Sequence, residues 1–243
     1  DDLVVRVPPC LAGAVVPAAD RAVRPTGGRL NARKCKAWAP STPEPAGLPE
    51  GFWQPEGLLL LRIPQGEGPN RGEDAPLPVG RSAVGQHLEK TLEGYRGFLA
   101  GLEEVVRDAP PKDPRVQTAV LLLRRCGQGK ATHLLRTLPP PLTQDFADSL
   151  DAATEGTLEN LCRLDALTPT QREQLRLPLR EGGLGLRAQA SLREAAYLGS
   201  WLGNLEGVRA RCPEGTASQE RFLHGDRDWA RALANAQAEL AAR

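Results

Sequence analysis

The sequence contains no methionine among its 243 residues, and isoleucine occurs only at Ile63. Lysine is scarce too, since nearly all basic residues are arginine. Together with abundant alanine, glycine, proline and leucine, this pattern indicates GC-rich coding bias rather than selection for a task. The formal net charge is only +1, so no overall basic field points to nucleic acid, and any such surface must come from local segregation of charge.

Closely paired metal ligands and long apolar runs are missing as well. The five cysteines and three histidines are scattered without a CxxC pair, which argues against a disulfide framework and a zinc module. No apolar stretch approaches the roughly 20 residues that cross a bilayer. We therefore expect a soluble intracellular protein, nuclear or cytoplasmic, with no membrane partner. The tryptophans lie too far apart in sequence to indicate a base-stacking platform.

From residue 81 onward the sequence is helical in pattern. Apolar residues recur at alternating spacings of four and three over 88–106, which predicts a helix over 83–107. Asp113 and Pro114 form an N-cap and a first-turn proline for a helix over 115–138. Further helices are expected over 142–164, early in 167–187, over 188–205 and over 217–242. The fold class is therefore mainly α.

The first 80 residues have a different character. The run "LVVRV" at 3–7 predicts a strand, and the alanine-rich segment 10–25 predicts a helix limited by Pro17 and Pro25. Residues 40–78 are rich in proline and glycine, which indicates an irregular connection. Within it, the apolar run "GLLLLRIP" at 57–64 predicts one short strand.

Charge is segregated between two neighbouring helical segments. Residues 112–136 have a local charge of +5, and residues 143–165 have a local charge of −5. One interpretation is a pair of helices whose faces attract each other; the other is a basic helix that grips nucleic-acid phosphates. In an unbroken helix, Arg125, Gln128, Thr132 and Arg136 form one polar stripe, flanked by Arg124 and Lys130. The two stripe arginines then lie about 16 Å apart.

The segment "LPLREGGLGLR" at 177–187 suggests a phosphate-binding loop at first sight. It lacks the Lys-Ser/Thr pair of a P-loop and the GxGxxG spacing of a dinucleotide site, so a structural turn is favoured. His133 lies one position off the apolar stripe of its helix and is interpreted as a surface residue rather than a metal ligand.

Several segments, taken in chain order, resemble the reverse transcriptases of non-LTR (LINE-like) retrotransposons. They are "DDLVV", "RLNARKCKAW", "LLRRC", "THLLRTLPP", "LPLREGGLGLR" and "AAYLGS". The resemblance implies that residues 1–40 are a small β remnant of a polymerase palm and 41–80 a linker with one short strand. It further implies that residues 81–165 are a helical thumb-like bundle and 166–243 a C-terminal helical region.

The resemblance also assigns roles to individual residues. It implies that Asp1 and Asp2 are catalytic carboxylates that ligate Mg²⁺, and that Lys34 lies near the departing pyrophosphate. Two Mg²⁺ ions with carboxylate ligands assist phosphoryl transfer. The predicted partners are an RNA template and a DNA primer. The residues expected to bind this RNA–DNA hybrid are Arg115, Arg124, Arg125, Lys130 and Arg136.

In that family an aromatic residue, another metal-binding aspartate and the nucleotide-binding segment precede the aspartate pair. We therefore expect the N-terminal half of the polymerase to be missing and this chain alone to be inactive in primer extension. Two alternatives stay open: a nucleic-acid-binding helical module that has lost catalysis, and a decayed element's product without activity. Gly127 and Gly129 favour decay, since glycine within a helix costs about 1 kcal/mol relative to alanine.

Overall fold

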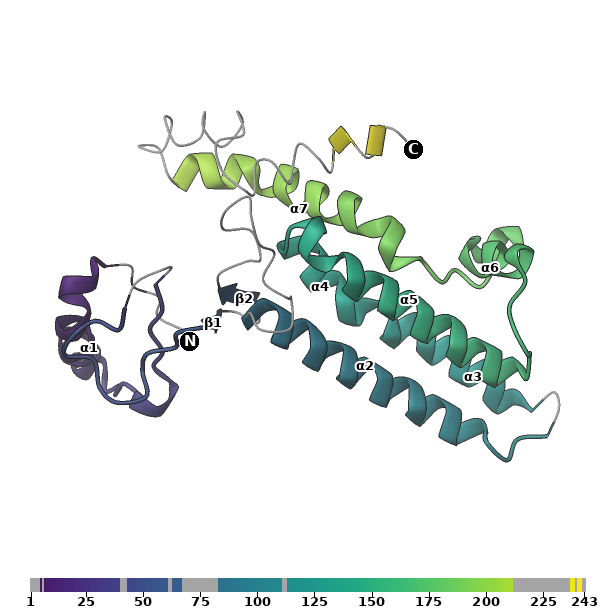
Figure 1. Ribbon diagram of the computed structural model, residues 1–243, viewed down its shortest axis with the longest axis horizontal. Helices are drawn as coiled ribbons and strands as arrows, with labels where there is room; N and C mark the ends of the chain where they lie inside the picture. The colour runs from purple at the N-terminus through teal and green to yellow at the C-terminus, as the bar shows by residue number, and fades with distance from the viewer. Residues whose placement is uncertain are drawn as a thin grey trace. The chain divides into compact units, whose positions relative to one another are not determined.

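The computed structural model describes residue 5 and residues 7–39, 43–60, 63–66, 83–110 and 113–211, together with 237, 238, 240 and 241. The chain divides into two compact units, residues 1–87 and 88–243, and the division falls within helix α2. The described chain is mainly helical with one small two-stranded sheet (Figure 1), as the fold class predicted. The four-part division into palm, linker, thumb and C-terminal region stays a prediction.

Helix α1 (Ala12–Val23) is the first α-helix of the first unit, and it lies between 3-10 turns at Pro9–Leu11 and Arg24–Thr26. The expectation that Pro17 limits this helix is wrong, because α1 continues through Pro17. The proline has no N–H to donate to the carbonyl four residues earlier, so the helix gives up one hydrogen bond there. Pro25 lies in the following 3-10 turn, which ends at Gly27 with φ 79°. Of the predicted 3–7 strand only Val5 and Val7 are described, and neither is in a strand.

A β-hairpin occupies the place where one strand was predicted. Strands β1 (Gly57–Leu60) and β2 (Ile63–Gly66) pair antiparallel, with Leu60 opposite Ile63. The prediction of a single strand over 57–64 is therefore wrong, because the chain reverses within the apolar run. A continuous apolar run indicates extended backbone but does not show where the chain turns back.

Helices α2 (Ala83–Val106) and α5 (Pro140–Cys162) are two of the long helices of the chain. The predicted apolar face of α2 is confirmed at five of its six positions, since Leu88, Tyr95, Leu99, Leu102 and Val106 are buried, and Leu92 is half-buried. Two side-chain hydrogen bonds join these helices: Tyr95 to Thr154 at 2.7 Å and Thr157 to Glu103 at 2.8 Å. Helix α5 starts at Pro140, two residues earlier than predicted, because proline is accepted in the first helical turn.

Helix α3 (Pro114–Leu122) continues through a π-turn (Leu123–Gly127) into α4 (Gly129–Thr137). The assumption of an unbroken α-helix over 115–138 is therefore wrong. Buried residues recur every four positions, at Ala119, Leu123, Gly127, Ala131 and Leu135. Four residues exceed one α-helical turn, so each step rotates the buried position by about 40°. A π-turn takes up the excess rotation and keeps these residues facing the core.

Gly127 lets α2 approach the π-turn closely. A Cβ atom there would lie 3.1 Å from both Leu123 Cδ1 and Phe98 Cε1. Gly127 is thus explained by packing rather than by decay of the sequence. At Gly129, by contrast, an added Cβ would meet nothing within 4 Å among the described residues.

Helix α6 (Pro169–Arg176) is short and begins with a capping box between Thr168 and Gln171. The glycine-rich segment after it forms a turn, which supports the structural interpretation. A Cβ on Gly183 would lie 2.0 Å from the Leu177 carbonyl oxygen, and Gly182 and Gly185 have φ of 79° and 66°. Glycine has no Cβ to collide with that oxygen at position 183, and it adopts a positive φ at positions 182 and 185 without strain.

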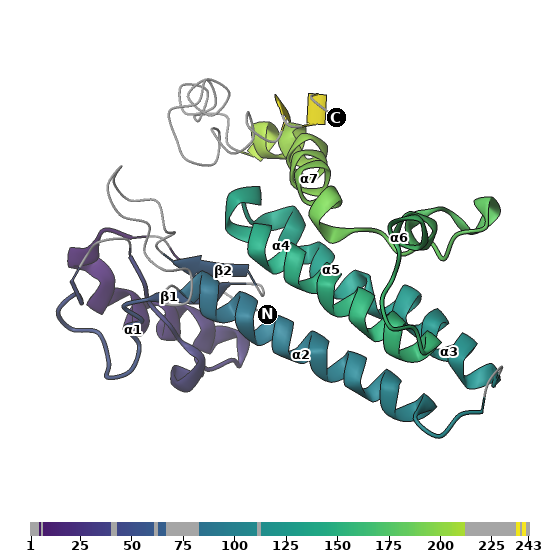
Figure 2. The same ribbon diagram turned by 45° about the vertical axis from the view of Figure 1, so that its right-hand side comes forward.

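Helix α7 (Gln189–Arg211) packs against α4 and α5 (Figure 2). It extends beyond the predicted end at residue 205. Most of the predicted helix 217–242 lies outside the described residues; 237, 238, 240 and 241 are helical.

Candidate nucleic-acid interface

The predicted metal carboxylates Asp1 and Asp2 lie outside the described residues, so the structure gives no geometry for them. Within the described ranges no group of three or more histidine, cysteine, aspartate or glutamate side chains is placed to hold a metal ion. Mg²⁺ at Asp1 and Asp2 therefore stays a prediction from the resemblance. The third predicted catalytic residue, Lys34, is exposed and ends a short 3-10 turn (Ala32–Lys34).

The segment that carries Lys34 is fixed on both sides. On one side, Leu30 N–H donates to Asp20 of α1, and an ion pair with Arg24 holds the pKa of the Asp20 carboxyl below its usual range. On the other side, Ala37 exchanges backbone hydrogen bonds with Phe52 and Gln54, at 2.8 and 2.9 Å, and Phe52 is buried. The first part of the proline-rich stretch is therefore folded onto the lysine segment.

The basic residues of the π-turn and α4 point away from the core. Arg125, Lys130 and Arg136 are exposed and Arg124 is half-buried, whereas Leu123, Gly127, Ala131, Leu134 and Leu135 of the same segment are buried. None of the four forms an ion pair with a carboxylate in the part of the chain that the structure describes. Lys130 Nζ lies 5.0 Å from the centroid of the Phe98 ring, within cation–π range. The π-turn thus leaves Arg125 and Arg136 on the solvent side.

Arg115 differs from the other predicted contacts because it is engaged by Asp113. Its Nε lies 3.1 Å from both carboxylate oxygens, and a terminal nitrogen lies 2.9 Å from one. The same carboxylate accepts the Arg115 backbone N–H and caps α3, which confirms the predicted N-cap. The guanidinium lowers the pKa of Asp113. Arg115 is therefore the weakest candidate for a phosphate contact.

The uncharged members of the predicted polar stripe serve the fold. Gln128 Oε1 accepts the backbone N–H of Arg187 at 2.8 Å. The hydroxyl of Thr132 donates to the Gln128 carbonyl at 3.2 Å, a common arrangement for threonine within a helix. The stripe therefore offers charge at Arg125 and Arg136, while Gln128 joins α4 to the turn after α6.

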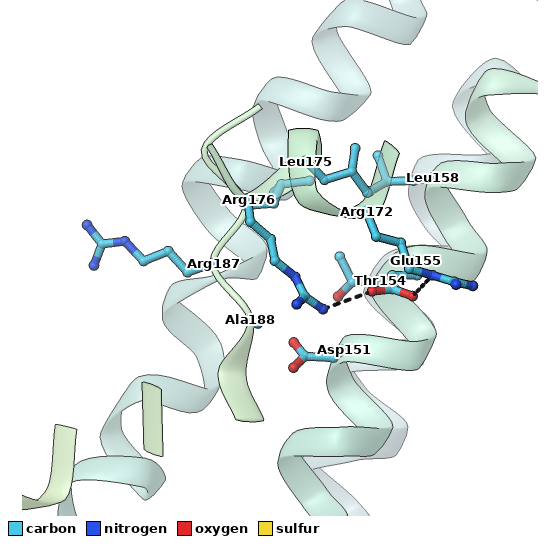
Figure 3. Close-up of a pocket in the computed structure, with 10 residues that line it drawn as sticks. Asp151, Thr154, Glu155, Leu158, Arg172, Leu175, Arg176, Arg187 and Ala188 are labelled. Carbon is cyan, nitrogen blue, oxygen red and sulfur yellow. Dashed lines mark hydrogen bonds and ion pairs between the residues drawn. The ribbon is translucent and has the colours of Figure 1, made fainter. Parts of the chain in front are cut away.

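Three acidic residues of α5, Asp151, Glu155 and Glu159, are engaged by the segment that follows that helix, and Figure 3 shows Glu155 beside Arg172 and Arg176. Glu155 forms ion pairs with Arg172 at 2.9 Å and Arg176 at 3.3 Å. Glu159 accepts the Leu167 N–H at 2.8 Å. Among the described residues no ion pair joins α5 to the basic residues of α3, the π-turn or α4. The two segments of opposite charge therefore do not neutralise each other through ion pairs.

Asp151 caps helix α7 from the neighbouring helix. Its carboxylate accepts the backbone N–H groups of Gln189 and Ala190 at 2.8 and 3.0 Å, at the positive end of the α7 dipole. Burial nevertheless raises the pKa of Asp151. The cavity beside it holds about 20 Å³, room for about one water molecule. This junction is therefore structural rather than a ligand pocket.

One basic residue at this surface was missed by sequence reasoning. Arg187 is exposed, and Figure 3 shows its side chain directed away from Asp151 and Glu155. Arg187 is the last residue of the glycine-rich turn, for which only the backbone conformation was predicted. The signal was present in the sequence as the arginine at the end of "LPLREGGLGLR".

Comparison with known proteins gives no match to a family model, a curated protein or a solved structure. The similarity to LINE-like reverse transcriptases therefore stays a prediction that depends on the quoted motifs. Across the described ranges, no helix combines the length and apolar character needed to span a membrane.

Proposed function

We propose that this chain is part of a LINE-like RNA-directed DNA polymerase, in which the basic side chains of the π-turn and α4 hold an RNA–DNA hybrid. The observation that carries the proposal is the contrast between two helical segments. Arg125, Lys130 and Arg136 are exposed and have no carboxylate partner among the described residues. The acidic side chains Glu155 and Glu159 of α5 are engaged elsewhere.

Charge without a partner on a rigid helix suits the phosphate backbone. Each phosphate neutralised by arginine or lysine releases condensed counterions, so binding is favoured at low salt and weakens as salt rises. Arg125 lies in the π-turn and Arg136 in the last turn of α4, eleven residues later, and both side chains are exposed. Contacts of this kind position a duplex without reading its sequence. Sequence-independent binding is therefore expected.

The catalytic part of the proposal depends on residues outside the described ranges. Asp1 and Asp2 would hold Mg²⁺, which supplies electrostatic stabilisation of the charge that develops in phosphoryl transfer. Lys34 would lie near the departing pyrophosphate, and its exposed position leaves the side chain accessible. Support for this part comes from the order of the sequence motifs.

The binding part is tested by fluorescence anisotropy with a labelled RNA–DNA hybrid at low salt. We expect the wild-type chain to bind, and unlabelled hybrids of unrelated sequence to compete equally. The double variant Arg125→Gln/Arg136→Gln removes two positive charges and should bind more weakly.

A matched control is available on α2 and just after it. Arg96 and Arg107 are exposed and also eleven residues apart, so Arg96→Gln/Arg107→Gln removes the same number of positive charges from another helix, although Arg107, unlike Arg125 and Arg136, is paired with Glu104. The control should bind nearly as well as wild type. Equal affinity of the two double variants, with circular dichroism showing that both are folded, would contradict the proposed interface.

A further inference from the structure

One hydrogen bond joins the turn after α6 to Gln128, between the π-turn and α4, and Gly185 of that turn lies close to Arg124. The backbone N–H of Arg187 donates to Gln128 Oε1 at 2.8 Å. A Cβ atom on Gly185 would lie 3.6 Å from Arg124 Cδ, which is ordinary contact distance. Arg187 and Arg124 are thereby held at the same junction.

Arg187 is anchored on both of its chain sides. Before it, Leu186 is buried, and its N–H donates to the Leu175 carbonyl at 3.0 Å. After it, the N–H groups of Gln189 and Ala190 are capped by Asp151. The backbone at Arg187 is therefore fixed while its side chain is exposed. A guanidinium on a fixed backbone loses less conformational entropy when it binds a ligand.

We infer that the glycine-rich turn is a second arm of the nucleic-acid interface, in which Arg187 contacts the phosphate backbone together with Arg124. The inference rests on the proposed function, because it extends the surface formed by Arg125, Lys130 and Arg136. The partner is the sugar–phosphate backbone. Arg124 and Arg187 form no ion pair with a carboxylate among the described residues, so their guanidinium groups can offer charge-assisted hydrogen bonds to phosphate oxygens. Gln128 acts as a positioning residue because it holds the backbone of Arg187 against α4.

The neighbouring arginine of the turn provides the control. Arg180 has an 83% exposed side chain, but its Nε pairs with Glu181 at 3.2 Å. The variants Arg187→Gln and Arg180→Gln remove the same charge from one turn. Neither substitution removes the bond between Gln128 and the backbone of Arg187.

The measurement is the dependence of hybrid affinity on salt concentration for these two variants. The slope of log affinity against log salt is negative, and the loss of one phosphate contact reduces its magnitude by about 0.9 for duplex DNA. Arg187→Gln should reduce the slope by about that amount, and Arg180→Gln should leave it nearly unchanged. Equal slopes for the two variants would overturn the inference.

Gln128→Ala tests the positioning role. It should weaken hybrid binding, and its effect should not add to that of Arg187→Gln, because both act on one contact. Full additivity would overturn the role of Gln128. If Arg125→Gln/Arg136→Gln weakens binding while Arg187→Gln does not, only the second arm fails. If neither weakens binding, the proposed function fails and the second arm with it.

Discussion

Gly127 and Gly129 offer a paired test of how the π-turn is packed. Both lie within the continuous helical segment, and both were interpreted from sequence as helix-weakening. Their surroundings differ, because a Cβ atom on Gly127 would lie 3.1 Å from Leu123 Cδ1 and Phe98 Cε1, whereas one on Gly129 would meet nothing within 4 Å in the described structure. The same substitution to alanine should therefore have opposite effects at the two sites.

The expected magnitudes follow from two competing contributions. Replacing glycine by alanine in a helix stabilises the folded state by about 1 kcal/mol. At Gly129 this contribution acts alone, so Gly129→Ala should raise the free energy of unfolding by up to about 1 kcal/mol. At Gly127 the new methyl group overpacks a site lined by the fully buried Leu123, and overpacking costs about 1–3 kcal/mol. Gly127→Ala should therefore lower stability by about 0–2 kcal/mol.

Urea unfolding followed by circular dichroism measures this difference. The urea midpoint multiplied by a common m-value gives the free energy of unfolding of each variant. The two values should differ by about 1–3 kcal/mol, with Gly129→Ala above wild type and Gly127→Ala at or below it. Equal stabilisation by both substitutions would refute the close approach of α2 to the π-turn, and with it the packing explanation for Gly127.

Two further predictions concern α5. The Thr154 hydroxyl donates to the Leu150 carbonyl, so the Tyr95 hydroxyl donates to Thr154. Tyr95→Phe should lower the free energy of unfolding by about 1 kcal/mol. Thr154→Val should lower it more, because valine leaves the buried Tyr95 hydroxyl without an acceptor. Paired denaturation curves check this order, and a larger cost for Tyr95→Phe contradicts it. Burial raises the pKa of Asp151, so the stability contributed by its protonated form is lost as pH rises through the folded-state pKa. The asparagine of Asp151→Asn does not ionise, so the free energy of unfolding of this variant relative to wild type should increase between about pH 3 and pH 7. Thermal melts at several pH values measure this difference, and a relative decrease would contradict the raised pKa.

The helices of the second unit could be predicted from local patterns. The apolar spacing of α2, the Asp113–Pro114 start of α3 and the glycine-rich turn each carry a local chemical signature, and the structure confirms all three. The π-turn was missed, because the pattern that explains it is one of burial, which the structure shows and the sequence does not. Five buried residues at a spacing of four, from Ala119 to Leu135, do not fit one face of a regular α-helix.

The sequence could not show which group each charged side chain pairs with, because that pairing depends on tertiary contacts. The acidic balance of residues 143–165 did not indicate that Asp151 caps α7 or that Glu155 pairs with Arg172. Nor did the basic balance of residues 112–136 show that Arg115 is engaged by Asp113. The reversal between β1 and β2 was hidden within one apolar run for a similar reason, since alternation and turn residues are both absent there.

The central claim, that Arg125 and Arg136 bind the phosphates of an RNA–DNA hybrid, is tested most directly by the salt dependence of binding. The slope of log affinity against log salt counts phosphate contacts at about 0.9 each for duplex DNA. Arg125→Gln/Arg136→Gln should reduce the slope by nearly two relative to wild type, while Arg96→Gln/Arg107→Gln leaves it unchanged. A folded Arg125→Gln/Arg136→Gln variant with the wild-type slope would contradict the claim.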